Sequence, residues 1–436
     1  MSQTNLVSGD FTLVTTGDSL IFQRISIFKE KEFLKVREIL KDADVAFNNF
    51  ETIIPGERGV PRYKTDPTAW MTSPRYVLDE LLWMGFNMFS LANNHSMDYS
   101  EGGLLETKRI FDEVGVANAG TGRILSEARA PAYLNTEKGR VALIAVNTRG
   151  EDIPAGEPRG RVPGRPGLNP MRSKEKVLLD GEGFKKLSEV AEKLGLAGPK
   201  EGKLNFLGNH VELSDRNDIH TEPYEPDLEG NLAAIENARK NADYVFVSVH
   251  NHDKLRPGVM YFDDTIEYIA KFVEDFCRAA IDAGADAILG HGTHCLNGIE
   301  IYKGHPIFYG MGNFISQNYN ANPKPYDWYE ARGLHKELYS DEPKGSLYPT
   351  LDTEADKRRV RRLETSVVAK VRFHEAKTRE IFLYPIQMNR GEKQGGHPFL
   401  VTGENGEEIL TRLSRLSKNY GTKIVIEKGV GKILLK

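Results

Sequence analysis

The sequence of 436 residues contains only two cysteines, Cys277 and Cys295. Two thiols cannot form the disulfide framework of a small secreted domain, and a reducing compartment is the simpler expectation. No apolar run approaches the roughly 20 residues that span a bilayer. The first residues, MSQTNLVSGDFTLV, lack the basic and apolar regions of a secretion signal. We therefore expect a soluble, cytoplasmic protein without a membrane anchor.

The sequence also lacks an excess of basic charge. Its 58 Lys and Arg residues stand against 62 Asp and Glu residues, so the formal net charge is −4 and no overall positive field attracts nucleic acid. Hydrophobic residues make up 39% of the chain and charged residues 28%, which excludes collagen-like, coiled-coil and largely disordered proteins. No G-x-G-x-x-G follows the first apolar run, which disfavours a dinucleotide-binding oxidoreductase.

Short apolar runs alternate with longer amphipathic segments along most of the chain. The runs have the length of strands, and several are apolar on both faces, as in a sheet that is covered on both sides. Alternation of strands and helices predicts an α/β fold. We expect strands at 11–16, 45–47, 87–91, 141–146, 244–249, 287–289 and 307–309, and helices at 29–41, 74–84, 102–114, 228–240 and 265–283.

Two regions depart from this alternation. Residues 149–230 form an irregular, Pro- and Gly-containing stretch with a weak helical pattern at 184–194, which is typical of an insertion or lid. Its arginines at 149, 159, 161, 165 and 172 would either bind an anion or belong to a solvated loop. Beyond residue 362 we expect strands at 365–373, 379–385 and 422–427, and a helix at 407–416. The predicted units are 1–148 and 231–330 (two halves of one core), 149–230 (the insertion) and 331–436 (returning strands with a C-terminal helix and strand).

Polar residues follow five of the predicted strands. In open α/β sheets the carboxyl ends of the strands share one edge, where ligands bind. A single Asp at such a position is usually a turn residue, but five groups of Asp, Glu, Asn and His indicate a metal site. The groups are Gly17-Asp18, Asn48-Asn49-Phe50-Glu51, Asn93-Asn94-His95, His250-Asn251-His252-Asp253 and Gly290-His291-Gly292-Thr293-His294.

The types of donor define the expected chemistry. Imidazoles and carboxylates without thiolates suit Mn, Zn, Fe or Co. Two metal ions need a shared ligand, which Asp18 or Glu51 would provide, and Asn94 offers a neutral carbonyl oxygen. Such metals activate water and bind the oxygens of an anionic substrate. We therefore expect one or two divalent transition metals.

The order of the motifs GD, NFET, LANNHSMDY, VSVHNH and GADAILGHGTHCLNGIEIYKGHPIFYGMGNF resembles the CapA-type proteins of poly-γ-glutamate capsule synthesis (PGA_cap). These proteins look like a branch of the calcineurin-like metallophosphoesterases. The similarity runs from Asp18 to Phe314, and the region from 365 to about 426 is similar to the family's returning strands. The resemblance implies a metal-dependent hydrolase with a four-layer α-β-β-α sandwich, in which the insertion lies over the active-site edge.

The resemblance also implies roles for individual residues. Asp18 and His294 would hold one metal, and Asn94, His250 and His291 the other, with Glu51 as the bridging ligand. His95 would donate a proton to the leaving group, and Asp98 would orient His95. Ser19-Leu20 follow Asp18 where the wider superfamily has a second metal-binding histidine. An enzyme with a single metal is therefore an alternative.

Further predictions concern residues around this set. We expect substrate contacts from Arg24, Lys64, Arg149 and His252, although His252 would alternatively support the metal ligands. Asn313 would brace the site by hydrogen bonds, and Gly208-Asn209-His210 is interpreted as a chance match to a metallophosphatase motif. Cys295 is interpreted as a buried thiol. His305 is expected in a turn, and His220, His335, His374 and His397 at the surface.

The expected substrate is a small or oligomeric anion. Phosphoesters and amides, including γ-glutamyl amides, are both open alternatives, because polarising P=O and polarising C=O require the same metal chemistry. The alternative function is a non-catalytic factor that binds or exports a capsule polymer and keeps only the fold.

Overall fold

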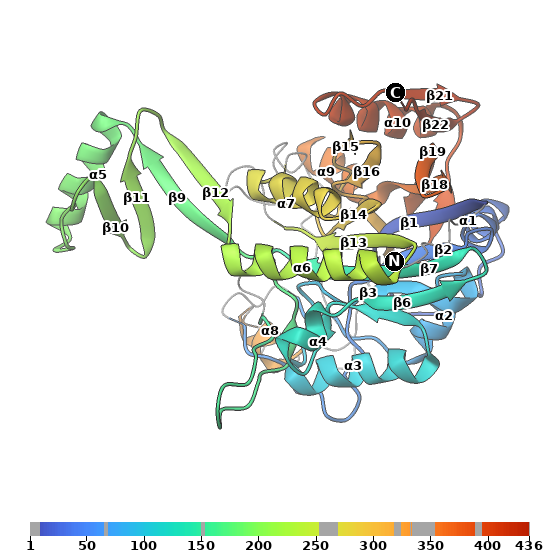
Figure 1. Ribbon diagram of the computed structural model, residues 1–436, viewed down its shortest axis with the longest axis horizontal. Helices are drawn as coiled ribbons and strands as arrows, with labels where there is room; N and C mark the ends of the chain where they lie inside the picture. Colours follow the sequence, from blue (N-terminus) through green and yellow to red (C-terminus); the bar gives the residue numbers. More distant parts are fainter. Residues whose placement is uncertain are drawn as a thin grey trace.

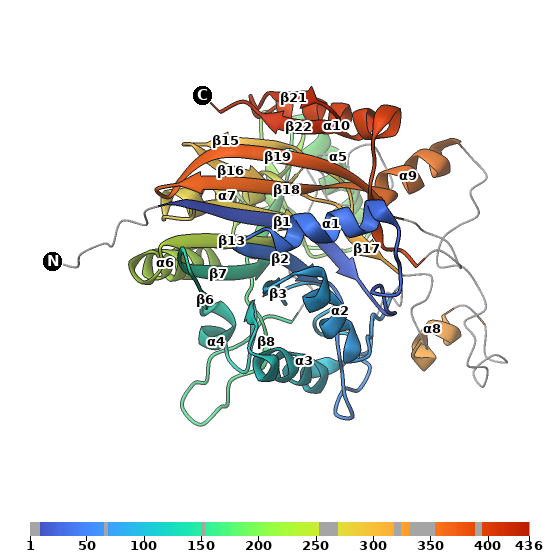
Figure 2. The same ribbon diagram turned by 90° about the vertical axis from the view of Figure 1, so that its right-hand side faces the viewer.

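The computed structural model describes residues 9–64, 69–149, 153–252, 269–317, 324–331, 333, 354–388 and 395–435. It has a mixed α/β fold, which confirms the expected class (Figures 1 and 2). Two large sheets contain most of the strands, and a smaller sheet projects from the body of the molecule (Figure 1).

The larger sheet has ten strands. They are β1 (Asp10–Leu20), β2 (Val45–Phe50), β3 (Met88–Ser90), β4 (Ala117–Ala119), β17 (Asn313–Ser316), β18 (Thr365–His374), β19 (Lys377–Met388), β20 (Pro398–Leu400), β21 (Ile424–Glu427) and β22 (Val430–Ile433). Their order is β21-β22-β19-β18-β1-β2-β3-β4, with β17 beside β1 and β20 beside β19. Strands β1 to β4 and β17 are parallel, whereas β18 returns antiparallel to β1 (Figure 2).

The second sheet has six strands. They are β6 (Ala132–Thr136), β7 (Gly139–Asn147), β13 (Tyr244–His250), β14 (Ala287–His291), β15 (Ile299–Tyr302) and β16 (His305–Phe308), in the order β15-β16-β14-β13-β7-β6. The central four strands are parallel, and β6 and β15 are antiparallel to their neighbours.

Alternate residues of the central strands enter different hydrophobic clusters. Phe11 of β1 stacks on Tyr244 of β13 with ring centroids 4.1 Å apart, in a cluster shared by the two sheets. Val14 instead packs with α1 (Lys31–Lys41), α2 (Tyr76–Met84) and α3 (Ser100–Val114). Val245 packs with α6 (Glu225–Asn241) and α7 (Lys271–Asp282). Burial on both faces explains why these strands read as continuous apolar runs.

Most predicted elements occur within a few residues of their expected bounds. The helix expected at 265–283 is α7, although residues 265–268 lie outside the described part of the chain. The helix expected at 407–416 is α10 (Gly403–Lys418). The other short elements are α4 (Leu125–Arg129), α8 (Tyr326–Glu330), α9 (Glu354–Glu364) and the paired strands β5 (Thr121–Gly122) and β8 (Gly167–Leu168).

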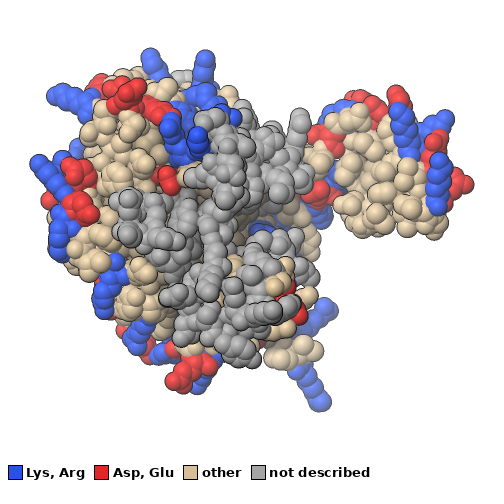
Figure 3. Space-filling model, turned by 180° about the vertical axis from the view of Figure 1, so that it is seen from behind, with Lys and Arg blue, Asp and Glu red and all other residues tan. Residues whose placement is uncertain are grey.

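Part of the insertion is more regular than its sequence predicts, and the helical pattern expected at 184–194 occurs as a helix at Gly181–Lys193. Strands β9 (Ser173–Leu179), β10 (Lys203–Phe206), β11 (Asn209–Leu213) and β12 (Asp218–Pro223) form a separate sheet, and α5 (Gly181–Lys193) packs on it around Phe184. We call residues 173–223 the arm, whose surface carries charges of both signs (Figure 3). The strands are short and rich in charged residues, as in the sequence SKEKVLL of β9, and this composition hides the alternation that marks a strand.

A few residues outside the site bear on the sequence predictions. His397, expected at the surface, is only 2% exposed and stacks on Phe28 with ring centroids 3.9 Å apart. His335 lies outside the described residues. Cys277 and Cys295 are both buried. Within the described part of the chain, no helix is long and apolar enough to cross a membrane.

Candidate metal centre

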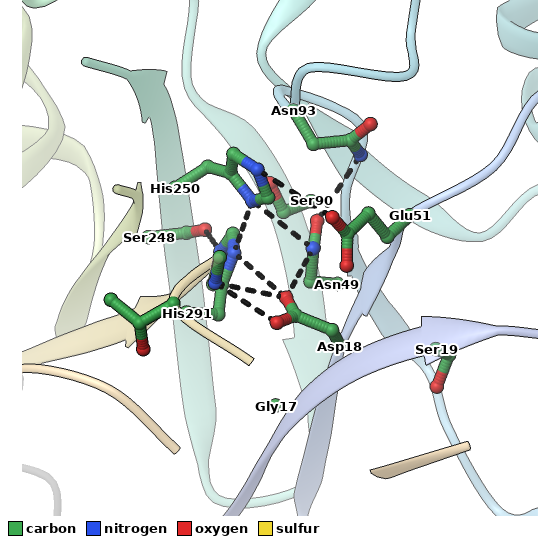
Figure 4. Close-up of polar contacts among 12 residues, drawn as sticks. Gly17, Asp18, Ser19, Asn49, Glu51, Ser90, Asn93, Ser248, His250 and His291 are labelled. Carbon is green, nitrogen blue, oxygen red and sulfur yellow. Dashed lines mark hydrogen bonds and ion pairs between the residues drawn. The ribbon is translucent and has the colours of Figure 1, made fainter. Parts of the chain in front are cut away.

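Strand register brings the predicted donors to one place. In the ten-stranded sheet Asp18 is level with Asn49, and in the six-stranded sheet His250 is level with His291. The carboxyl ends of these parallel strands meet at one edge, so the carboxylates of one sheet face the imidazoles of the other (Figure 4). Glu51 follows β2 directly, and its side chain points toward the same group (Figure 4).

Two glycines allow the close approach of backbone segments around this edge. A Cβ atom on Gly17 would lie 1.7 Å from the carbonyl oxygen of Gly312, so only glycine fits beside that loop. Gly292 has a φ of +98°, and its N–H donates to both carboxylate oxygens of Asp18, at 3.1 and 3.0 Å. The loop after β14 therefore fixes the orientation of Asp18.

Asp18 is fully buried, but polar contacts surround both of its carboxylate oxygens. Asn49 Nδ2 donates to its Oδ1 at 2.8 Å, His291 Nδ1 lies 3.6 Å from Oδ1, and His294 Nδ1 lies 3.3 Å from Oδ2. Burial alone would raise the pKa of Asp18, but the hydrogen bond and charge of His294, with smaller contributions from His291 and Asn49, hold that pKa below its ordinary value. Asp18 is therefore an anion at neutral pH.

Glu51 is buried without comparable support. No donor among the described residues forms a hydrogen bond to either carboxylate oxygen. His294 Nε2 and His250 Nε2 lie 3.5 and 3.8 Å from Oε1. Burial and, after it, the charge of Asp18 raise the pKa of Glu51 well above its ordinary value. A cation between the two carboxylates would offset the repulsion between Glu51 and Asp18 and the cost of burying Glu51 as an anion.

The imidazoles form a connected cluster. His250 Nδ1 lies 2.9 Å from His291 Nδ1, and His250 Nε2 lies 2.8 Å from His252 Nε2. The other nitrogen of His291, Nε2, lies 2.7 Å from Ser248 Oγ. Burial lowers the pKa of His291 to about 4, and burial with neighbouring imidazoles lowers the pKa of His250 well below its ordinary value. These rings are therefore neutral at pH 7, which is the form that binds metals.

Asn94, His294 and Asn313 complete the surroundings of the cluster. Asn94 Oδ1 lies 3.1 Å from His250 Nε2. His294 Nδ1 lies 2.8 Å from Asn313 Oδ1, and Asn313 Nδ2 donates to the carbonyl oxygen of Leu363 at 3.0 Å. His294 adopts a φ of +56°, a left-handed conformation that non-glycine residues rarely take. Asn313 thus links His294 to the end of α9.

His95 belongs to a separate polar group beside the cluster. Its Nδ1 lies 2.7 Å from Asp98 Oδ2, and Lys64 Nζ donates to Asp98 Oδ1 at 2.5 Å. The backbone N–H of Met71 also donates to Asp98, at 2.7 Å. Burial lowers the pKa of His95, although Asp98 opposes this shift. The other ring nitrogen, Nε2, lies 3.5 Å from Asn94 Nδ2, on the side of the metal donors.

The donor set fits a divalent transition metal. Three groups of residues each place ligand atoms within 4.8 Å of one another in the described part of the chain: Asp18, His250 and His291; Glu51, His250 and His252; and Asp18, Glu51 and His294. The donors are carboxylate oxygens and imidazole nitrogens, which suit such ions. The unsupported carboxylate of Glu51 is the observation that most directly calls for a cation.

The residues predicted to contact substrate lie in different surroundings. Arg24 pairs with Glu80 at 2.9 Å and lies over the ring of Tyr76. Lys64 pairs with Asp98, as described above. Arg149 lies close enough to His252 for its charge to reinforce the burial that lowers the pKa of His252. Substrate binding by these residues stays a prediction.

The other arginines of the insertion differ from Arg149. Arg172 forms a 2.7 Å ion pair with Asp227 of α6, and Arg159, Arg161 and Arg165 are exposed. His210 of the apparent Asn-His motif lies on the exposed strand β11 of the arm. The described contacts of His210 join it to the arm alone.

Sequence reasoning gave no role to Asn49, Ser248 or Gly292, which contact the donors directly. Asn49 and Ser248 were visible only as polar residues inside or beside apolar strands. Asn49 is level with Asp18 on β1, and Ser248 lies two residues before His250 on the same face of β13, so their functional signal is strand register and spacing. Register depends on tertiary pairing and cannot be read from local sequence.

Comparison with known proteins gives consistent matches. Residues 12–318 match the family described as bacterial capsule synthesis protein PGA_cap. An uncharacterized protein of Sinorhizobium fredii is 33% identical over 446 residues, which cover 99% of this chain and 94% of that protein. The capsule biosynthesis protein CapA of Bacillus anthracis is 25% identical over 284 residues, covering 65% of this chain and 53% of CapA. A probable polyglutamine synthesis accessory protein of Mycobacterium tuberculosis is 24% identical over 300 residues, covering 68% and 59%.

Proposed function

The chain belongs to the PGA_cap family of bacterial capsule synthesis proteins, and on this premise we propose that it is a metal-dependent hydrolase of an anionic substrate. We further propose that its two sheets and their covering helices correspond to the four-layer sandwich of the metallophosphoesterases. The shared cluster between the sheets, with α1 to α3 against one sheet and α6 and α7 against the other, supports this correspondence.

The single observation that carries the proposal is the buried carboxylate of Glu51, which has no hydrogen-bond donor among the described residues. This carboxylate lies near the neutral ring of His250 and the anionic Asp18. Asp18, Glu51, Asn94, His250, His291 and His294 would hold one or two divalent metals, and His252 is close enough to join them. Such metals would supply Lewis acidity toward water and toward the oxygens of the substrate. The protein supplies the orientation of its donors, through Gly292, Asn49 and Ser248.

His95 would donate a proton to the leaving group. In the protonated form of His95, Nδ1–H donates a hydrogen bond to Asp98. The second proton is then on Nε2, which faces the cluster. Lys64 and the N–H of Met71 bind Asp98 and keep this carboxylate in its orientation. The group can thus release a proton at one stated atom, Nε2, without changing its hydrogen bonds to Asp98.

The substrate is proposed to be an oligomeric or small anion with a phosphoester or an amide bond. Names of two relatives refer to capsule biosynthesis and to polyglutamine synthesis, which favours testing γ-glutamyl amides beside phosphoesters. Arg149 is the cationic side chain best situated for the substrate, because its charge acts on His252.

Metal analysis and kinetics together test the proposal. Protein purified without chelator is expected to contain a substantial fraction of one transition metal per chain and to hydrolyse at least one member of a panel of phosphoesters and γ-glutamyl amides. His291→Ala should lose metal, whereas His95→Ala should keep metal and lower kcat by about 10²–10⁴-fold. His210→Ala on the arm is the matched control.

Two results would contradict the proposal. If the purified protein contained no metal and took up none on titration, the donor cluster would not be a metal site and the proposal would be wrong. A metal-loaded protein that turns over no member of the panel, but binds capsule polymer equally well as wild type and as the His95→Ala variant, would instead support the non-catalytic alternative.

A further inference from the structure

A group of basic side chains lies outside the metal donor groups. It borders a pocket of about 150 Å³ between the C-terminal end of α9, the start of β18, the end of β19 and the first turns of α10. The lining includes Arg361, Arg412, Gln387, Asn405 and Ile409. We call it the arginine pocket. None of its lining residues belongs to the metal donor groups.

A hydroxyl group holds the two arginine-bearing segments together. Arg412 Nη2 donates to Thr365 Oγ1 at 3.0 Å, and Thr365 Oγ1 donates to the carbonyl oxygen of Arg361 at 2.8 Å. Thr365 is buried and Arg412 is half-buried, so this contact fixes the direction of the Arg412 side chain. A guanidinium that is already oriented loses less entropy when it binds an anion.

The acidic residue in the lining, Glu408, is a weak competitor for Arg361. Its Oε1 lies 3.4 Å from Arg361 Nη1, and the two side chains are 57% and 68% exposed. Exposed pairs of this kind contribute about 0–1 kcal/mol. A ligand carboxylate that reaches Arg361 can therefore replace Glu408 there at little cost.

The α9 wall of the pocket is rich in basic residues, whereas the first turns of α10 carry Glu404, Glu407 and Glu408. Lys357, Arg358, Arg361 and Arg362 lie within six consecutive residues of α9. Neither α9 nor α10 contains an aromatic residue, so the surface lacks the stacking platforms that single-stranded nucleic acids require. The charge thus favours a small anion over a nucleic acid.

We propose that the arginine pocket binds a carboxylate that adjoins an amide, the chemistry of an N-acylated acidic amino acid or of a peptide carboxyl end. Two guanidiniums match the two oxygens of a carboxylate. The amides of Gln387 and Asn405 offer both donors and acceptors to a neighbouring amide group, and Ile409 offers an apolar contact for aliphatic carbons. The binding requires no metal, so it is independent of the proposed hydrolase activity.

The pocket and the metal centre are neighbours in the fold. Leu363, two residues after Arg361, accepts a hydrogen bond from Asn313, which contacts His294. The carboxylate could therefore belong to a free small molecule or to an outlying part of a larger substrate. Both sources present the same carboxylate to the pocket. If the carboxylate belongs to a larger substrate, metal-loaded protein should bind a longer ligand more tightly than metal-free protein does.

Calorimetric titration of chelator-treated full-length protein with N-acetyl-L-glutamate tests the site. Arg412→Gln and Arg361→Gln are each expected to raise Kd at least about tenfold, because each removes one charged hydrogen bond to the carboxylate. Arg358→Gln removes the same charge from α9 outside the pocket and should change Kd less than about twofold. Circular dichroism and thermal melting of each variant confirm folding, and the exposed Arg361 gives a variant that leaves packing intact.

Three outcomes would contradict the proposed carboxylate site. They are no saturable binding of N-acetyl-L-glutamate to the wild type, an equal increase in Kd for Arg358→Gln and Arg412→Gln, or binding of inorganic phosphate as tight as that of N-acetyl-L-glutamate. A tetraglutamate peptide assigns the source of the carboxylate. Tighter peptide binding only in metal-loaded protein supports a part of the substrate, and equal binding with or without metal supports a free small molecule.

Discussion

At the scale of single residues, Glu51 combines full burial, a nearby like charge and no hydrogen-bond donor among the described residues. We predict that Glu51→Gln stabilises the metal-free protein by about 1–2 kcal/mol, because an amide removes the repulsion with Asp18 and can donate to it. The same change should reduce the stabilisation that added metal provides. Urea denaturation with chelator and with metal measures both effects.

The control for this prediction is Glu182→Gln on α5, where the side chain is 78% exposed and pairs only with Lys186 in the described contacts. This variant should shift the unfolding free energy by less than about 0.5 kcal/mol under either condition. If Glu51→Gln destabilised the metal-free protein and left the metal-dependent increment unchanged, Glu51 would be a structural residue and not a ligand.

Lys64 separates two interpretations of one side chain. The sequence predicts a substrate contact, whereas the structure pairs Lys64 with Asp98 at 2.5 Å. We predict that Lys64→Met lowers kcat about 10–100-fold with little change in KM, because His95 loses a firmly held partner. Steady-state kinetics on the best substrate, with metal content measured in parallel, tests this. A rise in KM at constant kcat would instead restore the substrate contact.

The convergence of the proposed donors at one edge was predictable from local sequence. Asp18, Glu51, Asn94, His250, His291 and His294 each follow an apolar run, and parallel strands end at one edge. The pairing of Lys64 with Asp98 and the burial of His397 against Phe28 were not predictable, because they depend on loops that meet only in the folded chain. Tertiary contact, and not residue type, decides the role of such side chains.

At the scale of elements, the arm packs mostly on itself, although its strand β12 also contacts α7. Its small core around Phe184, Ala191, Leu204 and Val211 is separate from the main clusters, and Ser173 and Pro223 are direct register partners across β9 and β12. We predict that replacing 173–223 by a short Gly-Ser turn leaves a folded core, with a melting temperature within about 3 °C of the full chain. Thermal melting and metal analysis of the shortened protein test this.

The kinetic consequence of this deletion distinguishes the arm from the rest of the insertion. The five arginines singled out in the sequence all precede the arm, so kcat/KM should be unchanged by its removal. Arg149→Gln, the matched comparison, should raise KM. A shortened protein that lost its activity but kept its metal would show that the arm takes part in binding the substrate.

Central strands and the arm show why elements differ in predictability. Strands such as β7 and β13 are buried on both faces and give continuous apolar runs that are easily recognised. The arm strands are short and carry many charged residues, and the small core that they form with α5 buries only a few side chains, so charge interrupts their pattern. Its fold was missed for this physical reason, whereas the class of the core was predictable.

At the scale of the whole molecule, the metal centre joins distant parts of the chain. Asp18 and Glu51 come from one sheet, His250 and His291 from the other, and about 200 residues or more separate the two pairs. A metal ion held between them therefore binds the folded state and has no comparable site in the unfolded chain. We predict that the chelated protein remains folded, because the clusters between and outside the sheets do not involve the donors.

Added metal should then raise the stability of the entire fold. At a free concentration of 100 times Kd the gain is about 2.7 kcal/mol, which corresponds to about 3 °C for a chain of this length. Thermal melts of chelated protein, with and without Mn²⁺ or Zn²⁺, measure the shift. His291→Ala should abolish the shift because it removes a donor from β14, and His210→Ala should preserve it because His210 lies on the arm. An equal shift in wild type and His291→Ala would locate the bound metal elsewhere and leave the cluster without its proposed ligand.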